Sequence, residues 1–203
     1  MTKLRPRPYL SWSQLDLVEK SPEQYLELYL YGKKIPINRG MAKGKIVADS
    51  LETGIMTGDI ETDLIISRLP KFEDMDLESR AIIKGGKGEE DIEILIKPDT
   101  AKRNKTGFKE YKTGQEMWTQ KKVDEWGQIT FYAMGMYLQT GKIPTDIELV
   151  HAETVKDSDG RLVFTGNIYR YKTQRSLVEI LRMITRCRKA WKVIGTIYSE
   201  AII

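Results

Sequence analysis

The sequence predicts a single α/β domain, built on a mixed β-sheet that helices flank. Helical periodicity fills the first third of the chain, the period changes to that of strands near Glu78, and strands then alternate with helices. With 203 residues, 40% of them hydrophobic, the chain can bury one substantial core. The sequence has no internal repeat, low-complexity tract or linker. We therefore expect one domain over residues 1–203, with the Arg- and Pro-rich residues 1–8 as a flexible tail.

Helices in the first third are indicated by N-cap residues that precede apolar residues at helical spacing. Ser11 or Ser13 can cap the first helix, and Ser21 followed by Pro22 is typical of the start of the second. Gly32 is expected to end that helix. The predicted helices cover residues 13–20, 21–32, 40–51 and 61–67, with a loop at 33–38.

Strand periodicity begins near Glu78 and is interrupted by two turn signals. The glycine-rich residues 85–88 are expected to form a hairpin turn, because they lack the helix and the Ser or Thr of a phosphate-binding loop. Residues 157–160 predict a second hairpin turn. The predicted strands are 79–84, 91–97, 108–112, 147–154 and 162–171, and the remaining helices are 123–138 and 173–191.

Composition excludes several classes of protein. A net charge of +4 and a pI near 8.9 permit nucleic-acid binding without requiring it. The single cysteine, Cys187, excludes an internal disulfide and a cysteine-ligated zinc or iron–sulfur site, and we expect it in the core. We find no apolar segment of membrane-spanning length and no signal peptide, which predicts a cytoplasmic protein, in a bacterial or phage-infected cell.

The segment from Ile92 to Gly114 carries the chemistry. An apolar run ends at Pro98-Asp99, a basic turn follows, and the next strand carries Glu110 and Lys112. Alternate side chains of a strand share one face, so Glu110 and Lys112 point the same way. If the two strands pair as neighbours, Asp99 lies beside Glu110. Two carboxylates and one ammonium group would then converge.

This set of groups suits a hard divalent cation and a phosphodiester. Mg²⁺ or Mn²⁺ prefers oxygen ligands, and Asp99, Glu110 and the backbone carbonyl of Tyr111 could supply them. Such a metal activates water and neutralises phosphate charge. Lys112 could orient or deprotonate the attacking water, or stabilise the pentavalent oxyanion. Taken alone, an E-x-K triplet is more often a pair of solvated charges.

At these residues the chain resembles the PD-(D/E)XK nuclease superfamily, and within it the RecB-like branch. Asp99 matches the family's metal-binding aspartate, and Glu110 and Lys112 match its E-x-K. Gln128 and Tyr132, one helical turn apart, resemble the Q-x-x-x-Y signature of that branch, whose side chains support the site. The resemblance implies a restriction-endonuclease-like core with a mixed central sheet. Without this context, Gln128 and Tyr132 would be interpreted as a surface glutamine and a core tyrosine.

Two positions modify the resemblance, which covers most of residues 10–138. Ser21 stands where a cysteine often precedes the proline, so no iron–sulfur cluster is expected. Ala48 stands where a metal-binding histidine often lies. Glu52, one turn further, could replace that ligand, whereas Asp49 points about 100° away. The alternative is that Glu52 is a surface carboxylate of the helix.

Basic residues near E-x-K predict where nucleic acid would bind. Trp118 could stack on a base or simply pack, and neither interpretation is favoured. Arg182, Arg186 and Lys189 form a second basic face, more typical of a solvated helix, and His151 is interpreted as structural. The predicted nucleic-acid-binding residues are Lys102, Arg103, Lys105, Trp118, Lys121 and Lys122, with Lys97, Lys109 and Lys112 adding to the basic cluster.

The resulting hypothesis is a Mg²⁺- or Mn²⁺-dependent deoxyribonuclease of DNA recombination, repair or phage DNA processing. The branch alone suggests exonuclease action; the residues do not distinguish it from endonuclease action or an RNase. The partner would be single- or double-stranded DNA, with a homo-oligomer or a recombination protein as further possibilities. The alternative is a catalytically weak or inactive nucleic-acid-binding or assembly protein, which Ala48 favours and the intact Asp99, Glu110 and Lys112 oppose.

Overall fold

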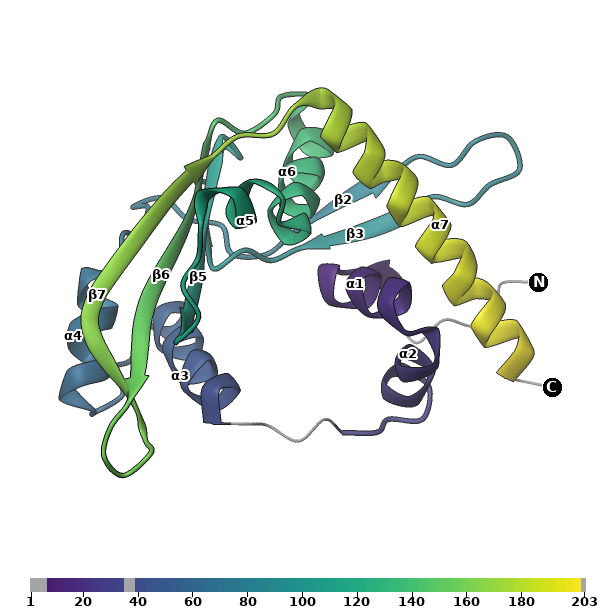
Figure 1. Cartoon of the computed structure of the whole chain (residues 1–203). Helices are drawn as coiled ribbons and strands as arrows, with labels where there is room; N and C mark the ends of the chain where they lie inside the picture. The colour runs from purple at the N-terminus through teal and green to yellow at the C-terminus, as the bar shows by residue number, and fades with distance from the viewer. Residues whose placement is uncertain (1–6, 35–38, 202–203) are drawn as a thin grey trace.

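A computed structural model of the chain describes residues 7–34 and 39–201, and in these ranges strands and helices form a mixed α/β fold with two sheets (Figure 1). The predicted fold class is confirmed, although the strands are divided between two mixed sheets. Most of the predicted tail, residues 1–6, and most of the predicted loop, residues 35–38, lie outside the described ranges.

The first sheet has the strand order β1-β3-β2. Its central strand pairs in parallel with β1 and antiparallel with β2, with Leu10 opposite Ile94 and Ala81 also opposite Ile94. The side chains of Ile92, Ile94 and Ile96 are buried, as expected for a central strand covered by a helix. Its strands are β1 (Tyr9–Leu10), β2 (Ser79–Ile83) and β3 (Ile92–Ile96).

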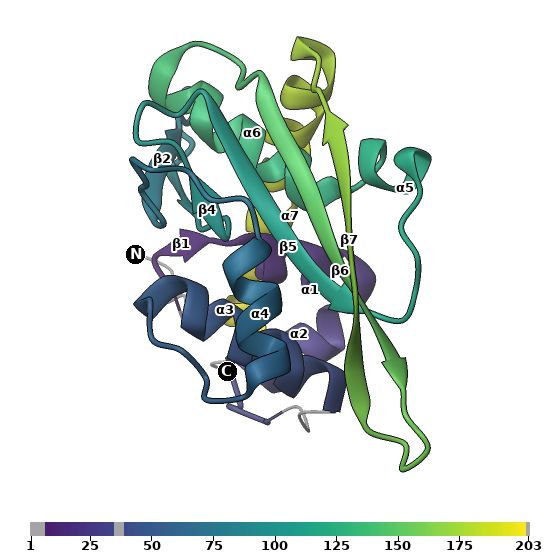
Figure 2. The same ribbon diagram turned by 90° about the vertical axis from the view of Figure 1, so that its left-hand side faces the viewer.

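The second sheet has the order β4-β5-β6-β7 and holds the E-x-K segment. Strand β5 pairs antiparallel with β4 and in parallel with β6, so it lies inside the sheet. Helices α3 and α4 pack against β5 and β7 near one end of this sheet (Figure 2). Its strands are β4 (Thr100–Ala101), β5 (Gly107–Gly114), β6 (Asp146–Lys156) and β7 (Leu162–Thr173), and the two helices are α3 (Arg39–Thr53) and α4 (Ile60–Arg68).

The helices at the N-terminal end begin where the caps predict. Ser11 precedes α1 (Trp12–Lys20), and its backbone N–H donates to Gln14 Oε1 at 2.9 Å. Ser21 precedes α2 (Pro22–Tyr29), and its hydroxyl accepts the N–H of Gln24 at 3.3 Å. Local sequence therefore determines these two helix starts.

Two predicted helices were wrong in their bounds. The single helix expected at 123–138 is divided into α5 (Gln120–Asp124), capped by Thr119, and α6 (Gly127–Thr140). The last helix, α7 (Leu177–Ala201), begins later than residue 173 and extends beyond 191. Thr173 instead ends β7, where its hydroxyl donates to Asp124 at 2.8 Å. Tertiary contacts at the sheet edge decide both boundaries.

Helix α6 lies between the two sheets and forms the centre of the main core (Figure 1). Gly135 of α6 allows Ile96 of β3 to approach closely, because an added Cβ would lie 2.3 Å from that side chain. Cys187 of α7 is fully buried in the same core, as expected. In the described ranges, no helix is long and apolar enough to cross a membrane.

Strands β3 and β5 are not neighbours, which corrects the assumption that they pair. They lie in different sheets. The chain leaves β3 through Lys97-Pro98-Asp99 and immediately forms the short strand β4, where Thr100 is opposite Lys109 of β5. Asp99 therefore arrives beside β5 by crossing from one sheet to the other.

A substitution at Gly127 tests the close packing at the start of α6. A Cβ there would lie 2.4 Å from the Trp12 ring, which is rigid and cannot yield as a flexible side chain does. We expect Gly127→Ala to destabilise the protein by about 1–3 kcal/mol, despite the better helix propensity of alanine. Urea denaturation measures this. The control is Gly114→Ala, where an added Cβ meets no described atom within 4 Å. Equal or higher stability of Gly127→Ala would contradict this packing.

Candidate functional site

Asp99 and Glu110 lie side by side at the junction of the two sheets. The N–H of Tyr111 on β5 donates to Asp99 Oδ2 at 2.6 Å, which fixes that carboxyl group against the strand. Burial and, next, the charge of Glu110 raise the pKa of Asp99 to about 7, against the lowering effects of Lys112 and the Tyr111 N–H. Two carboxyl groups therefore share a poorly solvated position.

Glu110 is buried, with 3% of its surface exposed, and two side chains hold its carboxylate in place. Its Oε1 accepts hydrogen bonds from Lys112 Nζ at 2.9 Å and from Gln128 Nε2 at 2.7 Å. Its Oε2 is buried and has no hydrogen-bond partner among the described residues. A buried carboxylate oxygen without a partner is costly, so this atom is available to a ligand that supplies positive charge.

Lys112 is held as an ammonium group. Burial by itself lowers the pKa of Lys112, but the charges of Glu110 and Asp99 and the hydrogen bond to Glu110 together raise it above its ordinary value. The Nζ atom also lies 4.8 Å from the centre of the Trp126 ring. A protonated lysine donates hydrogen bonds. This favours orientation of water or oxyanion stabilisation over the role of a base.

Gln128 and Tyr132 project together from the first turns of α6. Gln128 Nε2 donates to the hydroxyl of Tyr132 at 2.9 Å and to Glu110 at 2.7 Å. Burial and the charge of Glu110 raise the pKa of Tyr132 well above its ordinary value, so the phenol stays neutral. The pair suggested by the Q-x-x-x-Y pattern thus reaches the E-x-K strand, and Gln128 orients Glu110.

Tyr111 presents its backbone and its side chain to different partners. The phenol points away from Glu110 and donates to the carbonyl of Pro70 at 2.7 Å. The N–H and C=O of one strand residue face the same edge, so the carbonyl of Tyr111 faces the Asp99 edge that its N–H contacts. The predicted role of this carbonyl as a metal ligand stays a prediction.

A cavity of about 320 Å³ opens onto Asp99, and we call it the site cavity. Asp99, Gln128 and Tyr132 line it, together with Ala48 and Glu52 of α3. Helix α3 therefore faces the site through the positions at which the sequence suggests a metal ligand.

Glu52 lies in this cavity but already has a partner. Its carboxylate forms an ion pair with Lys97 at 3.1 Å, and both side chains are about half exposed. Asp49 pairs instead with Lys45 on the same helix. Among residues 7–34 and 39–201, no group of three or more His, Cys, Asp or Glu side chains is close enough to hold a metal ion. The assignment of Glu52 as a ligand stays a prediction.

The basic turn between β4 and β5 is less available to nucleic acid than its sequence suggests. Each of its predicted contacts, Lys102, Arg103 and Lys105, forms an ion pair with an acidic side chain, so its charge is locally compensated. The acidic partners are Asp146 at 2.8 Å, Asp74 at 2.6 Å, and Asp76.

The segment after β5 places Trp118 under Lys122. The Trp118 ring packs against Trp126 with centroids 4.8 Å apart, and Lys122 Nζ lies 4.5 Å from its centre. Lys122 also pairs with Glu116 at 2.6 Å. Lys121 is exposed, and its ion pair with Glu125 is longer, at 4.0 Å. Packing of Trp118 is thus observed, and its stacking on a base stays a prediction.

Lys109 does not belong to the basic cluster, which is a correction. It points to the opposite face of β5 from Glu110, as strand alternation requires, and its buried Nζ donates to Glu148 at 2.9 Å. Glu148 also accepts two hydrogen bonds from Arg170. Strand alternation in the sequence was a sufficient signal to separate Lys109 from the site.

Sequence reasoning missed the part of the site that comes from the N-terminal segment. Arg7, Ser11, Trp12 and Ser13 line the site cavity opposite α3. Arg7 was assigned to a flexible tail. Its position depends on β1 pairing with β3, a long-range contact that no local pattern indicates. His151, by contrast, is structural as expected: it is fully buried and its Nε2 lies 3.0 Å from the Gly114 carbonyl oxygen.

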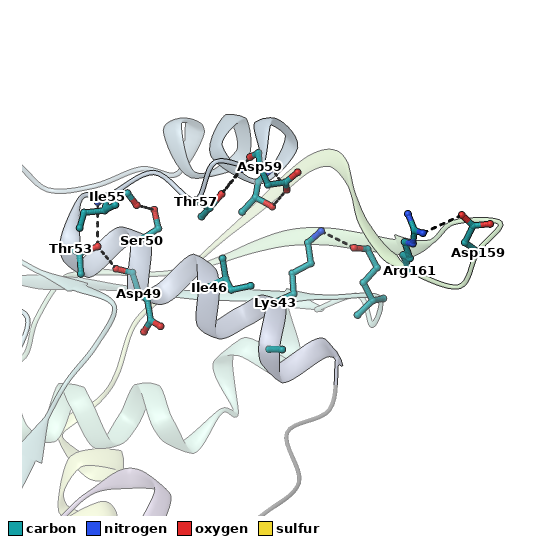
Figure 3. Close-up of a pocket in the computed structure, with 13 residues that line it drawn as sticks. Lys43, Ile46, Asp49, Ser50, Thr53, Ile55, Thr57, Asp59, Asp159 and Arg161 are labelled. Carbon is teal, nitrogen blue, oxygen red and sulfur yellow. Dashed lines mark hydrogen bonds and ion pairs between the residues drawn. The ribbon is translucent and has the colours of Figure 1, made fainter.

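A larger cavity of about 810 Å³ lies elsewhere, between α3, the α3–α4 connection and the β6–β7 turn (Figure 3). Its polar groups are already engaged: Lys43 Nζ donates to the Leu162 carbonyl at 2.7 Å, and Asp59 accepts the N–H of Thr62. It contains neither Asp99 nor Glu110. Its size alone does not make it the reactive site.

Comparison with known proteins supports the fold. No protein-family model matches the sequence, and no curated protein matches it significantly. The structure is similar to that of a "putative exonuclease" from Eubacterium rectale, with a TM-score of 0.57 and 14% identity over 93% of this chain and 82% of that one. This chain therefore shares the α/β fold of that protein. A second solved structure has 14% identity over 95% of this chain and 79% of that one, with a TM-score of only 0.46.

Replacing Asp99 by asparagine tests the crowding of the two carboxyl groups. The pKa of Asp99 is about 7 when folded against an ordinary value of 3.8, so the folded state binds a proton that the unfolded state releases between these values. Stability is therefore lost as pH rises from about 4 to about 7. We expect Asp99→Asn to stabilise the protein on the order of 2–4 kcal/mol at about pH 8 and little at about pH 4.

Urea denaturation of wild type and Asp99→Asn at both pH values measures this difference. Asparagine can still accept the Tyr111 N–H, so the backbone contact is preserved. A variant that is less stable than wild type at about pH 8 would contradict the electrostatic account of the site.

Proposed function

We propose that the protein is a metal-dependent deoxyribonuclease that hydrolyses phosphodiester bonds. The observation that carries this proposal is the buried pair Asp99 and Glu110, with Glu110 Oε2 unpartnered among the described residues and Lys112 fixed beside it. The shared fold of a nuclease-like neighbour supports it at the level of architecture.

The donor set fits a hard divalent cation. An unpartnered carboxylate oxygen, together with a neighbouring carboxyl group whose pKa is raised by burial and by Glu110, is an environment that positive charge would relieve. Mg²⁺ or Mn²⁺ would be held by Asp99, Glu110 and the Tyr111 carbonyl, with Glu52 as a further ligand once released from Lys97. When bound, such a metal activates water and neutralises phosphate charge.

The residues of the chain then divide the remaining tasks. Lys112, as an ammonium group, donates to a phosphate oxygen or orients the attacking water. Gln128 holds the Glu110 carboxylate in one orientation, and Tyr132 accepts the other hydrogen bond of the Gln128 amide. Trp126 covers Lys112 on one side and restricts water there.

The substrate class and the setting belong to the same proposal. DNA, single- or double-stranded, is the proposed partner, and exonuclease action in recombination, repair or phage DNA processing is the proposed role. The description of the Eubacterium rectale neighbour as a "putative exonuclease" agrees with this role. We also propose that the protein is cytoplasmic and has no iron–sulfur cluster. It would act as a homo-oligomer or with a partner protein.

A second candidate function is binding of nucleic acid without turnover. Ala48 provides no metal ligand at the α3 position that lines the site cavity. Glu52 is neutralised by Lys97. A protein of this kind would bind DNA but leave it intact with every divalent metal.

Removal of the Lys112 ammonium tests the nuclease proposal. We expect wild type to cleave labelled DNA with Mg²⁺ or Mn²⁺ and not with EDTA. We expect Lys112→Ala to lose about 10²–10³-fold in rate, because a charged donor to the reacting phosphate is lost, while DNA binding is retained. Gel assays on end-labelled linear and on circular DNA measure cleavage and distinguish exonuclease from endonuclease action. Intact DNA after incubation of wild type with each metal would support the second candidate instead. The same assay with RNA tests an RNase.

Substitution of Glu52 tests the third carboxylate. If Glu52 binds the metal, Glu52→Gln should weaken Mn²⁺ binding about 10–100-fold, judged by calorimetry. The matched control is Asp49→Asn on the same helix, whose carboxylate pairs with Lys45. Equal Mn²⁺ affinity of Glu52→Gln and wild type would remove Glu52 from the site.

A further inference from the structure

The N-terminal segment forms one wall of the site cavity. Arg7, Ser11, Trp12 and Ser13 line it, opposite Ala48 and Glu52 of α3. Strand β1 holds this segment in place by pairing in parallel with β3, the strand that leads into Asp99. The wall is therefore attached to the same element that positions a catalytic carboxyl group.

Arg7 differs in its partners from the other cations near the site. Its guanidinium lies over the aromatic rings of Tyr29, 5.1 Å from the centroid, and Tyr9, at 5.9 Å. Among the described residues it has no carboxylate partner. Lys97, which also lines the site cavity, and Lys112 are each paired with a glutamate.

Aromatic partners orient Arg7 without neutralising it. A carboxylate removes the net charge of its partner, whereas the face of a tyrosine ring attracts a cation while leaving its full charge. The guanidinium presents a planar set of donors that matches phosphate oxygens, and its stacking on aromatic faces reduces the entropy lost on binding. Arg7 is thus an exposed and oriented cation without a carboxylate partner in the described part of the chain, at the rim of a cavity that Asp99 and Glu52 also line.

A polyanion that enters this cavity meets the carboxyl groups of Asp99 and Glu52, which line it, so a cation outside the reacting position would favour its binding. Without metal, Lys112 is paired with Glu110 and Lys97 with Glu52, whereas Arg7 has no carboxylate of the described residues to leave before it binds a phosphate. Ser13 provides a hydroxyl on the same wall, 3.1 Å from that of Ser11. The cation at the rim is available to a phosphate that flanks the scissile one.

From this arrangement we infer that Arg7 forms a phosphate-binding subsite for the nucleic-acid strand, at the rim of the site cavity. The subsite binds a backbone phosphate next to the one that reacts. It therefore contributes affinity and positioning but no base preference. This inference rests on the proposed nuclease function, since it names how the same site holds its substrate.

The experiment measures binding of a fluorescein-labelled oligothymidylate by anisotropy in EDTA, so that no strand is cut. We expect Arg7→Gln to weaken binding about 3–10-fold and to reduce the slope of log affinity against log salt by about 0.7, the amount for one phosphate contact on a single strand. Arg7→Lys keeps the charge and should retain the wild-type slope. The matched control, Arg161→Gln, removes an exposed arginine in the β6–β7 turn outside the site cavity and should leave the slope unchanged.

The outcomes separate this inference from the proposed function. If wild type binds DNA and cleaves it, but Arg7→Gln and Arg161→Gln have equal affinity and salt slope, the phosphate subsite is wrong and the nuclease proposal stands. If wild type neither binds nor cleaves DNA, both fail. Thermal melting of Arg7→Gln checks folding. If that variant is unfolded, Arg7→Met decides, because it also removes the charge: a salt slope reduced by about 0.7 supports the subsite, and an unchanged slope overturns it.

Discussion

The proximity of two carboxyl groups in a poorly solvated position is the constraint on which the site depends. The charge of Glu110 raises the cost of ionising Asp99, and neither carboxyl group can move away. Asp99 is fixed by the Tyr111 N–H, and Glu110 by Lys112 and Gln128. Strand β5 provides the Tyr111 N–H and Lys112, helix α6 provides Gln128, and the connection from β3 to β4 carries Asp99. A protein that needed only stability would replace such a pair with apolar side chains.

The fold provides this constraint through the arrangement of its two sheets. Asp99 occupies the short connection from β3 to β4, which carries the chain from the first sheet into the second. Helix α6 fills the space between the sheets and directs Gln128 and Tyr132 to Glu110. Because Gly127 and Gly135 let Trp12 and Ile96 approach α6 closely, the helix has little freedom to shift. Core packing therefore sets the geometry of the candidate site.

Charge compensation separates the surface cations by their availability. Most lysines and arginines near E-x-K are paired with carboxylates, which lowers their attraction for a polyanion. Cations without a carboxylate partner indicate better where a nucleic-acid strand would bind than the density of basic residues in the sequence does. By this criterion, Arg7 on the N-terminal wall of the site cavity is a better candidate contact than the paired cations of the β4–β5 turn.

The sequence by itself determined what depends on local rules. Caps at Ser11 and Ser21 predicted two helix starts, alternation placed Glu110 and Lys112 on one face, and helical spacing placed Gln128 with Tyr132. Strand alternation also places Lys109 on the face of β5 opposite Glu110, away from the site. These features need only the geometry of one element.

Only the tertiary structure decided the rest. It divided the strands between two sheets, interrupted the helix expected at 123–138, paired Glu52 with Lys97 and brought Arg7 to the cavity. Each of these depends on contacts between residues far apart in the chain, such as β1 with β3 or α3 with the end of β3. Periodicity and spacing report the neighbours of a residue along one element. They carry no information about which other element will lie against it.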